Sequence, residues 1–184
     1  MKTRSFLIGT LALLLCSVSA PSLACGYDGM AVDLATAHPA SLPVALAIFD
    51  AYEARLLARP IPLQGGFGLR RAQVMLDKLR TALAPITKGD SFSLLLVEPG
   101  LWARFDGTGA ELRMTLHVPA PAEGETTVIT GEGVLQALVQ GKLGVDQALQ
   151  AGLIQVLAPA LQTERLTSAL LQAFPRPPLA VAAP

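Results

Sequence analysis

The stretch that decides the fold is Thr127–Val156, TVITGEGVLQALVQGKLGVDQALQAGLIQV. It opens and closes on β-formers, and between them it predicts two short helices, Leu135–Gln140 and Val145–Ala151. Gly141 and Gly152 each end one of these helices, because glycine adopts the left-handed conformation of a helix C-terminus at little cost. Neither helix carries a catalytic group. Both are so apolar that we expect them to be buried against core side chains or a bound apolar molecule.

Upstream of this stretch, three segments have the alternating pattern of strands. They are Ser91–Val97, Leu101–Phe105 and Glu111–Val118. The third has the cleanest alternation, with apolar and polar side chains on opposite faces. Asp106-Gly107-Thr108-Gly109 is typical of a β-hairpin turn, so we expect the second and third segments to pair as a hairpin.

Helical periodicity predicts further helices before and after the strands. The first covers Val44–Arg59, the second covers Leu69–Ala84, and the last begins with Thr163 as its N-cap. The side chains expected to face inward are Ile48, Phe49, Tyr52 and Leu56 in the first helix, Leu69, Ala72, Leu76, Leu79, Leu83 and Ile86 along the second, and Leu166, Leu170 and Phe174 in the last. Together these elements predict one α+β domain with a mostly antiparallel sheet covered by helices.

The first 24 residues have the pattern of an export signal. Lys2 and Arg4 precede an apolar run, Phe6–Leu15, which is too short to span a bilayer comfortably. Ser22-Leu23-Ala24 then supplies the small residues of a cleavage site. We therefore expect export to the periplasm or the cell surface, with an uncleaved N-terminal membrane anchor as the alternative.

Composition narrows the function classes. Cleavage after Ala24 leaves 184 − 24 = 160 residues, the size of one domain. Without Lys2 and Arg4, 12 basic residues face 14 acidic ones, a net charge of 12 − 14 = −2. This balance argues against nucleic-acid binding, and the polybasic cluster that docks on anionic lipid is missing. With 52% hydrophobic and only 15% charged residues, the chain has either a large core or an apolar cavity.

Cys25 is the only cysteine expected after cleavage, because Cys16 lies in the signal. No internal disulfide is then available, although the compartment would permit one. We expect ordinary cleavage, which leaves Cys25 as a free or intermolecularly paired thiol. The alternative is lipidation of Cys25, which would attach the protein to a membrane. Ser22-Leu23-Ala24 matches a lipoprotein cleavage box only in part, since its leucine stands one place too close to the cysteine.

The sequence contains no pattern typical of a catalytic or metal site. Its two histidines, His38 and His117, have no catalytic motif of serine, aspartate or cysteine around them. Gly107-Thr108-Gly109 and Gly131-Glu132-Gly133 are too short to cradle a phosphate. In the second of these, Glu132 is placed to stabilise the start of a helix through its dipole. We therefore expect a protein that is not an enzyme and needs neither metal nor cofactor.

Taken with the strands before it, VITGEGVLQALVQGKLGVDQALQAGLIQV resembles the lipid-binding domain of the sterol carrier protein type two family. The resemblance lies in the strand, short helix, Gly-Lys-Leu turn, second short helix and Gly-Leu before a strand, and it covers Ser91–Phe174, about half of the chain. It implies a five-stranded sheet covered by helices, with an apolar tunnel for a fatty acyl chain, sterol or other lipid. Two departures stand out. Val156-Leu157-Ala158-Pro159 replaces the longer, more polar strand usual in the family, and family members are usually intracellular or fused to enzymes.

Two functional hypotheses follow. In the first, the protein is an exported, non-enzymatic carrier of a lipid or another apolar small molecule. The side chains expected to line its cavity are Leu94, Leu96, Leu112, Met114, Leu116, Leu135, Leu138, Leu149 and Leu153. In the second, the core is dry and the protein is an accessory module of an exported redox or membrane complex. Its docking surface would be the Cys25 segment and the two N-terminal helices.

The expected organisation of the chain has four parts. Residues 1–24 are the signal, and residues 25–90 form a lead segment with the N-terminal helices. Residues 91–174 form the sterol-carrier-like α+β domain, and residues 175–184 are a loose C-terminal tail.

Overall fold

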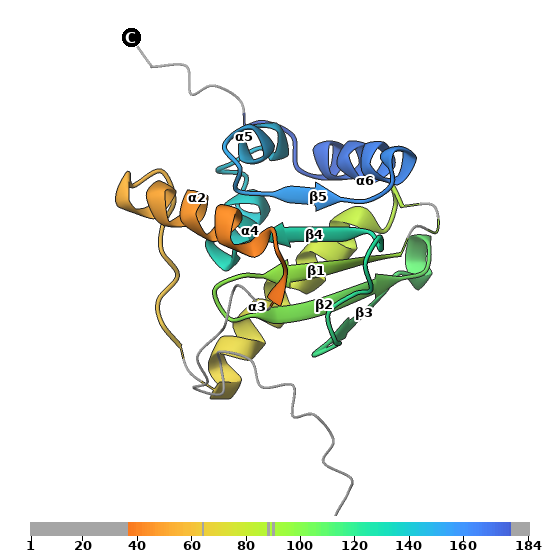
Figure 1. Ribbon diagram of the computed structural model, residues 1–184, viewed down its shortest axis with the longest axis horizontal. Helices are drawn as coiled ribbons and strands as arrows, with labels where there is room; N and C mark the ends of the chain where they lie inside the picture. The colour runs from red at the N-terminus through yellow and green to blue at the C-terminus, as the bar shows by residue number, and fades with distance from the viewer. Residues whose placement is uncertain (1–36, 64, 88, 90, 178–184) are drawn as a thin grey trace, which may run out of the picture.

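A five-stranded sheet forms the centre of the molecule in the computed structural model, which describes residues 37–63, 65–87, 89 and 91–177 (Figure 1). The strands are β1 (Phe92–Leu96), β2 (Leu101–Asp106), β3 (Arg113–Leu116), β4 (Thr127–Thr130) and β5 (Gln155–Leu157). Their order across the sheet is β3-β2-β1-β4-β5. The β1–β4 pair is parallel and the other pairs are antiparallel. The α+β fold and the five strands are as expected, and the sheet is mixed with mostly antiparallel pairs.

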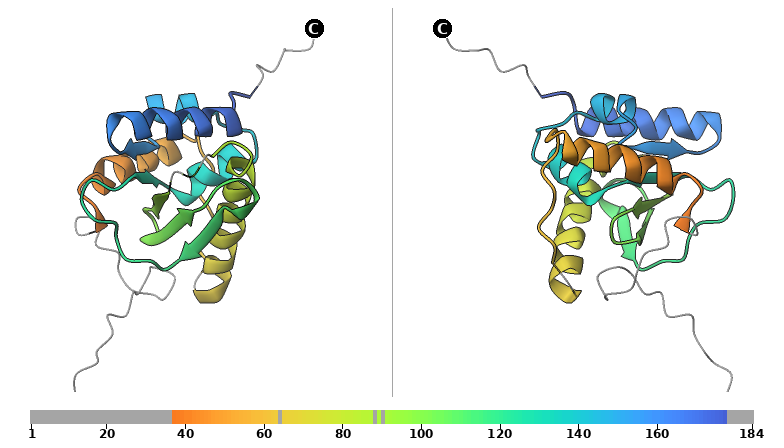
Figure 2. Two further views of the ribbon diagram at one scale, coloured as in Figure 1. Left: turned by 90° about the vertical axis from the view of Figure 1, so that its right-hand side faces the viewer. Right: turned by 60° about the vertical axis from the view of Figure 1, so that its left-hand side comes forward.

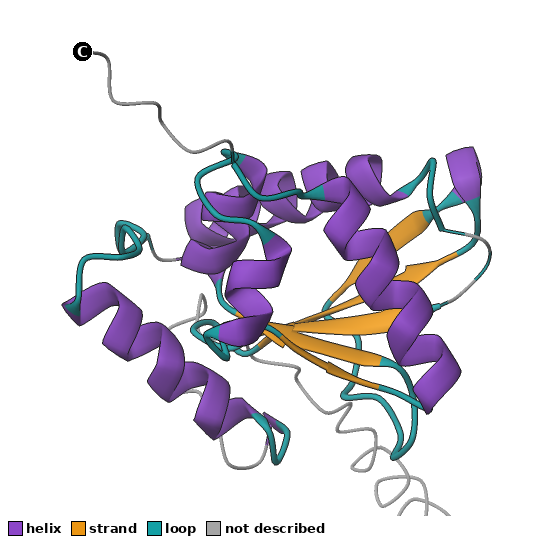
Figure 3. Ribbon diagram, turned by 90° about the horizontal axis from the view of Figure 1, so that it is seen from above, coloured by secondary structure: helices purple, strands orange, loops and turns teal. Residues whose placement is uncertain are grey.

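Helices lie on both sides of this sheet. They are α2 (Ser41–Glu53), α3 (Gly65–Leu83), α4 (Glu132–Val139), α5 (Val145–Gln150) and α6 (Ala160–Ala173), with a 3-10 turn, η2 (Gly109–Glu111), between β2 and β3. The α2 helix lies across one face and α3 across the opposite face (Figures 1 and 3), while α6 lies beside β5 and reaches α3 (Figure 2). No helix in the described part of the chain is long and apolar enough to span a membrane.

The central strand β1 is buried along its whole length because helices cover both of its faces. On the face toward α2, Trp102 lies beside Leu95 and meets the ring of His38 edge-on, with 6.4 Å between centroids. On the opposite face, toward α3, Phe92 stacks on Phe105 with centroids 4.6 Å apart. The alternation predicted for this strand therefore separates two buried faces rather than an inner and an outer one.

The segment Thr127–Val156 folds as strand, helix, helix and strand, as predicted. Gly141 and Gly152 have φ values of 65° and 70°, the left-handed conformation expected at the two helix ends. The predicted second N-terminal helix is also confirmed, and it begins four residues earlier than expected, at Gly65. Its predicted inward side chains Ala72, Leu76, Leu79 and Leu83 are all buried.

The first helix differs from the prediction in its end and in its buried face. It stops at Glu53, because Arg55 takes a left-handed φ of 58° and the Leu56 amide donates to the Ala51 carbonyl at 2.9 Å. Phe49 and Leu56, predicted to face inward, are 51% and 79% exposed. The side chains that pack inward are Ser41, Val44, Ile48 and Ala51. Periodicity misjudged the face because α2 is apolar on more than one side.

Two further boundaries are corrected. The α6 helix begins at Ala160 after Pro159, so Thr163 lies in the first turn and is not the N-cap; its hydroxyl donates to the Ala158 carbonyl at 2.9 Å. The β2–β3 connection is also longer than the predicted four-residue turn, since η2 lies within it. The predicted inward residues of α6 are confirmed: Leu166, Leu170 and Phe174 are buried.

Removing the Phe105 ring tests how much the aromatic stack contributes to the free energy of unfolding. Phe105 is fully buried, so Phe105→Ala should lower the free energy of unfolding by about 3–5 kcal/mol through lost burial and a cavity. Urea denaturation measures this change. Phe67→Ala is the matched control, because Phe67 is 81% exposed, and it should stay within about 0.5 kcal/mol of the parent. Equal losses in the two variants would contradict the assignment of the core.

Candidate functional site

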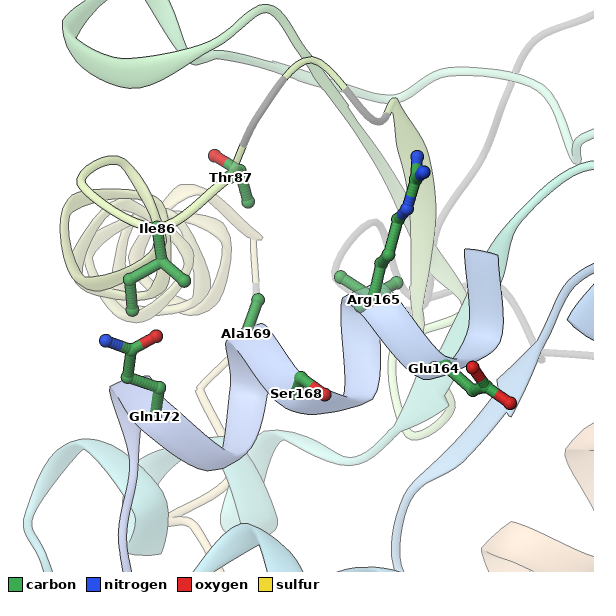
Figure 4. Close-up of a pocket in the computed structure, with 8 residues that line it drawn as sticks. Ile86, Thr87, Glu164, Arg165, Ser168, Ala169 and Gln172 are labelled. Atoms are coloured by element: carbon green, nitrogen blue, oxygen red, sulfur yellow. The ribbon is translucent and has the colours of Figure 1, made fainter. Parts of the chain in front are cut away.

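A groove of about 610 Å³ runs between α6 and the C-terminal end of α3 (Figure 4). Two segments far apart in the sequence form it: Ile86 and Thr87, just after α3, and one side of α6. The α6 residues that line it are Glu164, Arg165, Leu166, Ser168, Ala169 and Gln172. The groove therefore exists only because α6 lies against α3.

The groove has an apolar floor and a polar rim. Leu166 and Ala169 are 4% and 6% exposed and belong to the core, and Ile86 packs against that core. Thr87 is held in place by hydrogen bonds: its hydroxyl donates to the Leu83 carbonyl at 3.2 Å, and its own carbonyl accepts from the Thr108 hydroxyl at 3.2 Å. A molecule in the groove would therefore lie against a fixed apolar surface.

The rim offers one negative charge, one positive charge and neutral polar groups. Glu164, Arg165, Ser168 and Gln172 are exposed around the opening (Figure 4). These groups can donate and accept hydrogen bonds. The groove therefore suits a molecule that is mainly apolar and has a small polar end.

The nine side chains predicted to line a cavity all lie in or against one apolar cluster. Leu94, Leu96, Leu112, Leu135, Leu138 and Leu153 are at most 4% exposed, and Met114, Leu116 and Leu149 are partly buried against them. None of the nine lines the groove beside α6. Leu166 and Ala169 belong to the same cluster, so the groove floor is continuous with this core. The assignment of the nine residues to a ligand stays a prediction.

Sequence reasoning missed the residues that line the groove, except that Leu166 and Ile86 were expected to face inward. Ser168, Ala169 and Gln172 have no chemistry that would single them out in the sequence. Ile86 was assigned to the helical pattern of α3, and it lies just past the end of that helix. No sequence signal placed α6 beside α3, and this contact of distant segments forms the groove.

A second pocket, of about 330 Å³, contains the most buried ion pair of the described chain. Arg71 of α3 makes a bidentate pair with Glu132, the first residue of α4; the second contact, from Nη2 to Oε2, measures 3.0 Å. Their side chains are 23% and 5% exposed. The same guanidinium donates to the Ile61 carbonyl. This pair therefore ties α3, α4 and the segment after α2 together.

Glu98, in the turn after β1, completes this cluster. Its carboxylate accepts the Glu132 amide at 2.8 Å and the Tyr52 hydroxyl at 2.8 Å. Glu98 thus caps the first amide of α4, while Glu132 itself stands in the first turn of that helix, as the sequence predicted. Burial, and then the negative charge of Glu98, raise the pKa of Tyr52 above its usual range. The tyrosine is therefore a hydrogen-bond donor here and not a base.

The two glycines around Glu132 allow this close packing. A Cβ atom on Gly131 would lie 2.6 Å from Ile48 Cδ1 and 2.7 Å from Glu98 Oε1, and one on Gly133 would collide with the Tyr52 ring and hydroxyl. Both positions need glycine because α2 approaches so closely, not because a phosphate binds there. The pair Gly131 and Gly133 is therefore structural.

Several sequence predictions concern residues outside the groove and the ion-pair cluster. Cys25 and the expected signal, residues 1–24, lie outside the described residues. Among the described residues, no group of three or more His, Cys, Asp and Glu side chains could hold a metal ion. Burial lowers the pKa of His38, whose Nδ1 accepts the Ala40 amide at 3.1 Å. The division of the chain at residue 91 stays a prediction.

The buried ion pair can be tested by removing one partner. Arg71→Met leaves the Glu132 carboxylate buried without its cation, so we expect a loss of roughly 2–4 kcal/mol in the free energy of unfolding. Arg71→Met combined with Glu132→Leu should recover part of this loss. Arg59→Met, which breaks the exposed pair with Glu53, should cost less than about 1 kcal/mol. Similar losses of unfolding free energy for Arg71→Met and Arg59→Met would refute the stabilising role of the Arg71–Glu132 pair.

Tyr52 gives a pH-dependent prediction. Its pKa is raised in the folded state, so its hydrogen bond contributes fully below the unfolded-state pKa of about 10 and is lost progressively as the pH rises above that value. Thermal melting between pH 8 and 11 should therefore show a steeper alkaline loss in the parent than in Tyr52→Phe. Parallel pH profiles for the two proteins would count against the interaction.

The structure is similar to several solved structures at low sequence identity. For palmitated SCP2L2 from Aedes aegypti the TM-score is 0.40, with 16% identity over 53% of this chain and 92% of that one. For sterol carrier protein 2 the TM-score is 0.37, with 17% identity over 58% of this chain and 95% of that one. For the sec-alkylsulfatase Pisa1 from Pseudomonas sp. the TM-score is 0.36, with 13% identity over 51% of this chain, and the match spans only 14% of that enzyme. No protein-family model and no curated protein matches the sequence.

Proposed function

We propose that this protein binds an apolar small molecule, such as a lipid, in the groove between α6 and the end of α3, and that it acts as a non-enzymatic carrier. The groove itself is the observation that carries the proposal. Its volume of about 610 Å³ falls within the range of roughly 300–1,000 Å³ found for ligand pockets. Its floor of Leu166, Ala169 and Ile86 matches an apolar ligand.

An apolar ligand needs little directed chemistry to bind there. Each Å² of apolar surface removed from water contributes about 25 cal/mol, whatever the identity of the ligand. The rim residues Ser168, Gln172 and Arg165 are placed to contact a polar end at the surface.

The side chains predicted to line a cavity lie in the core behind the groove floor. Leu94 and Leu112 belong to the same apolar cluster as the groove floor, and both are almost fully buried. A long ligand would therefore have to separate α6 from the rest of the core to reach them. A side-chain hydrogen bond across this boundary joins Thr126, which precedes β4, to Gln162 in α6 at 3.1 Å.

The proposal includes export, which rests on the sequence alone. Lys2, Arg4 and the apolar run Phe6–Leu15 support a signal for the periplasm or the cell surface. Lipidation of Cys25 would then keep the carrier at a membrane. The apolar groove favours a carrier over the accessory interaction module with a dry core.

A bulky side chain in the groove tests the site. Ser168→Trp places an indole over the apolar floor from an exposed position, so the fold should be retained while the space for a ligand is lost. We expect at least about a tenfold loss of affinity for a fluorescent fatty acid or sterol analogue, followed by fluorescence titration. Native mass spectrometry of the parent should reveal a co-purified apolar molecule.

Leu171→Trp is the matched control. Leu171 lies on α6 and is 38% exposed, but it does not line the groove. This variant should bind the probe as the parent does. Equal binding by the parent and Ser168→Trp would overturn the placement of the site, and a parent that binds neither probe and carries no co-purified molecule would overturn the carrier function.

A further inference from the structure

The second pocket, of about 330 Å³, lies apart from the groove and shares no lining residue with it. Segments far apart in the sequence line it: Tyr52 of α2, residues 59–63 after that helix, Arg71 of α3, residues 98–99 after β1, and Glu132 of α4. Its volume lies at the lower end of the range of roughly 300–1,000 Å³ found for ligand pockets. The pocket therefore suits a ligand smaller than a long lipid.

One wall of this pocket is apolar. It consists of residues 60–63, Pro-Ile-Pro-Leu, together with Pro99. The two prolines among residues 60–63 have a fixed φ, and the Ile61 carbonyl accepts a hydrogen bond from Arg71, so this wall is held in place. Ile61 and Leu63 are 74% and 41% exposed, so a hydrocarbon chain can reach the wall from solvent.

The opposite wall is charged, and its two arginines are each engaged with a carboxylate. Arg71 forms the bidentate pair with Glu132. Arg59 pairs with Glu53, which lies outside the pocket, at 3.1 Å. The positive charges at the pocket are therefore matched by these two glutamates, and the charge of Glu98 remains.

Glu98 receives hydrogen bonds from neutral donors. These are the Tyr52 hydroxyl and the Glu132 amide, each at 2.8 Å. An ionised carboxylate has about four acceptor positions, so it can accept further N–H groups. Because Glu98 is exposed, it presents this acceptor capacity and a negative charge at the opening of the pocket.

Tyr52 indicates the sign of the electrostatic potential at this wall. Burial is the largest cause of its raised pKa, and the negative charges of Glu98 and Glu132 raise that pKa further. A potential that disfavours a phenolate anion favours a cation. A cation already lies on the same ring, since Arg59 Cζ is 5.1 Å from the ring centroid of Tyr52.

We propose that this pocket binds a small organic cation, a primary alkylammonium, whose N–H groups donate to Glu98 and whose hydrocarbon chain lies on residues 60–63. An ammonium supplies three donors, and its hydrogen bonds to a carboxylate are charge-assisted. The hydrocarbon chain covers the exposed apolar wall. This site does not depend on ligand binding in the groove.

Four probes with the same hydrocarbon chain test the proposal: hexylammonium, hexyltrimethylammonium, hexan-1-ol and hexanoate. Each is titrated at neutral pH into the full chain carrying Ser168→Trp, which fills the groove, while ¹H–¹⁵N chemical shifts are followed. Hexylammonium should shift the amide of Glu132, because that amide donates to Glu98, with a dissociation constant on the order of 1 mM. The other three probes should bind at least about fivefold more weakly.

Substitutions at Ile61 test the charge preference without disturbing the ion-pair cluster. The side chain is 74% exposed, and the bond from Arg71 goes to the backbone carbonyl, so the fold should be retained. Relative to Ile61→Gln, we expect Ile61→Glu to tighten hexylammonium binding about threefold and Ile61→Lys to weaken it about threefold. Leu161→Lys is the matched control on exposed α6 and should bind hexylammonium as the parent does.

Glu98→Gln removes the proposed acceptor charge. This variant should bind hexylammonium at least about fivefold more weakly and lose the preference for it over hexan-1-ol. The Ile61 series decides the charge preference if Glu98→Gln is too unstable to titrate, since Glu98 also caps α4.

The outcomes decide the proposal. A Glu132 amide that does not respond to hexylammonium overturns it, and so does equal or tighter binding of hexan-1-ol or hexanoate. Equal binding of hexyltrimethylammonium, which has no N–H group, would overturn the role of Glu98 as the acceptor. Preference for hexylammonium that follows the charge at position 61 would establish the site, whether or not the groove binds a lipid.

Discussion

The start of α4 is the point on which the arrangement of the other elements depends. Glu132, the first residue of this helix, is almost fully buried and pairs with Arg71 of α3, while its amide is capped by Glu98 from the turn after β1. Tyr52 of α2 donates to the same Glu98 carboxylate. Three helices and a strand end therefore converge on one peptide segment.

This convergence has a physical cost that explains the local sequence. A buried carboxylate is tolerated only when it is paired and hydrogen-bonded, and here the Arg71 guanidinium supplies both interactions. Gly131 and Gly133 leave room for Ile48, Glu98 and Tyr52 to approach. The glycine on each side of Glu132 therefore marks a tightly packed junction between α2, the turn after β1 and α4.

The groove lies elsewhere in the molecule and depends on different contacts. Leu166 and Ala169 are part of the core, so the groove floor is as fixed as the core itself, while the rim residues are exposed.

Local sequence patterns determined the elements of this protein. The apolar period of α3, the glycines at the ends of α4 and α5, and the alternation of β3 are each set by contacts within a few residues, so they can be read without the fold. The buried face of α2 could not be read in this way, because Phe49 and Ile48 are both apolar and only contact with the sheet selects Ile48. The contacts that form the groove and the buried ion pair could not be predicted from local patterns either. Ile86 meets α6, and Arg71 meets Glu132 across 61 residues, only through the tertiary fold. The sequence by itself determined which segments are helix or strand and which side chains are apolar, whereas only the tertiary structure decided which apolar faces are covered and which distant residues share a site.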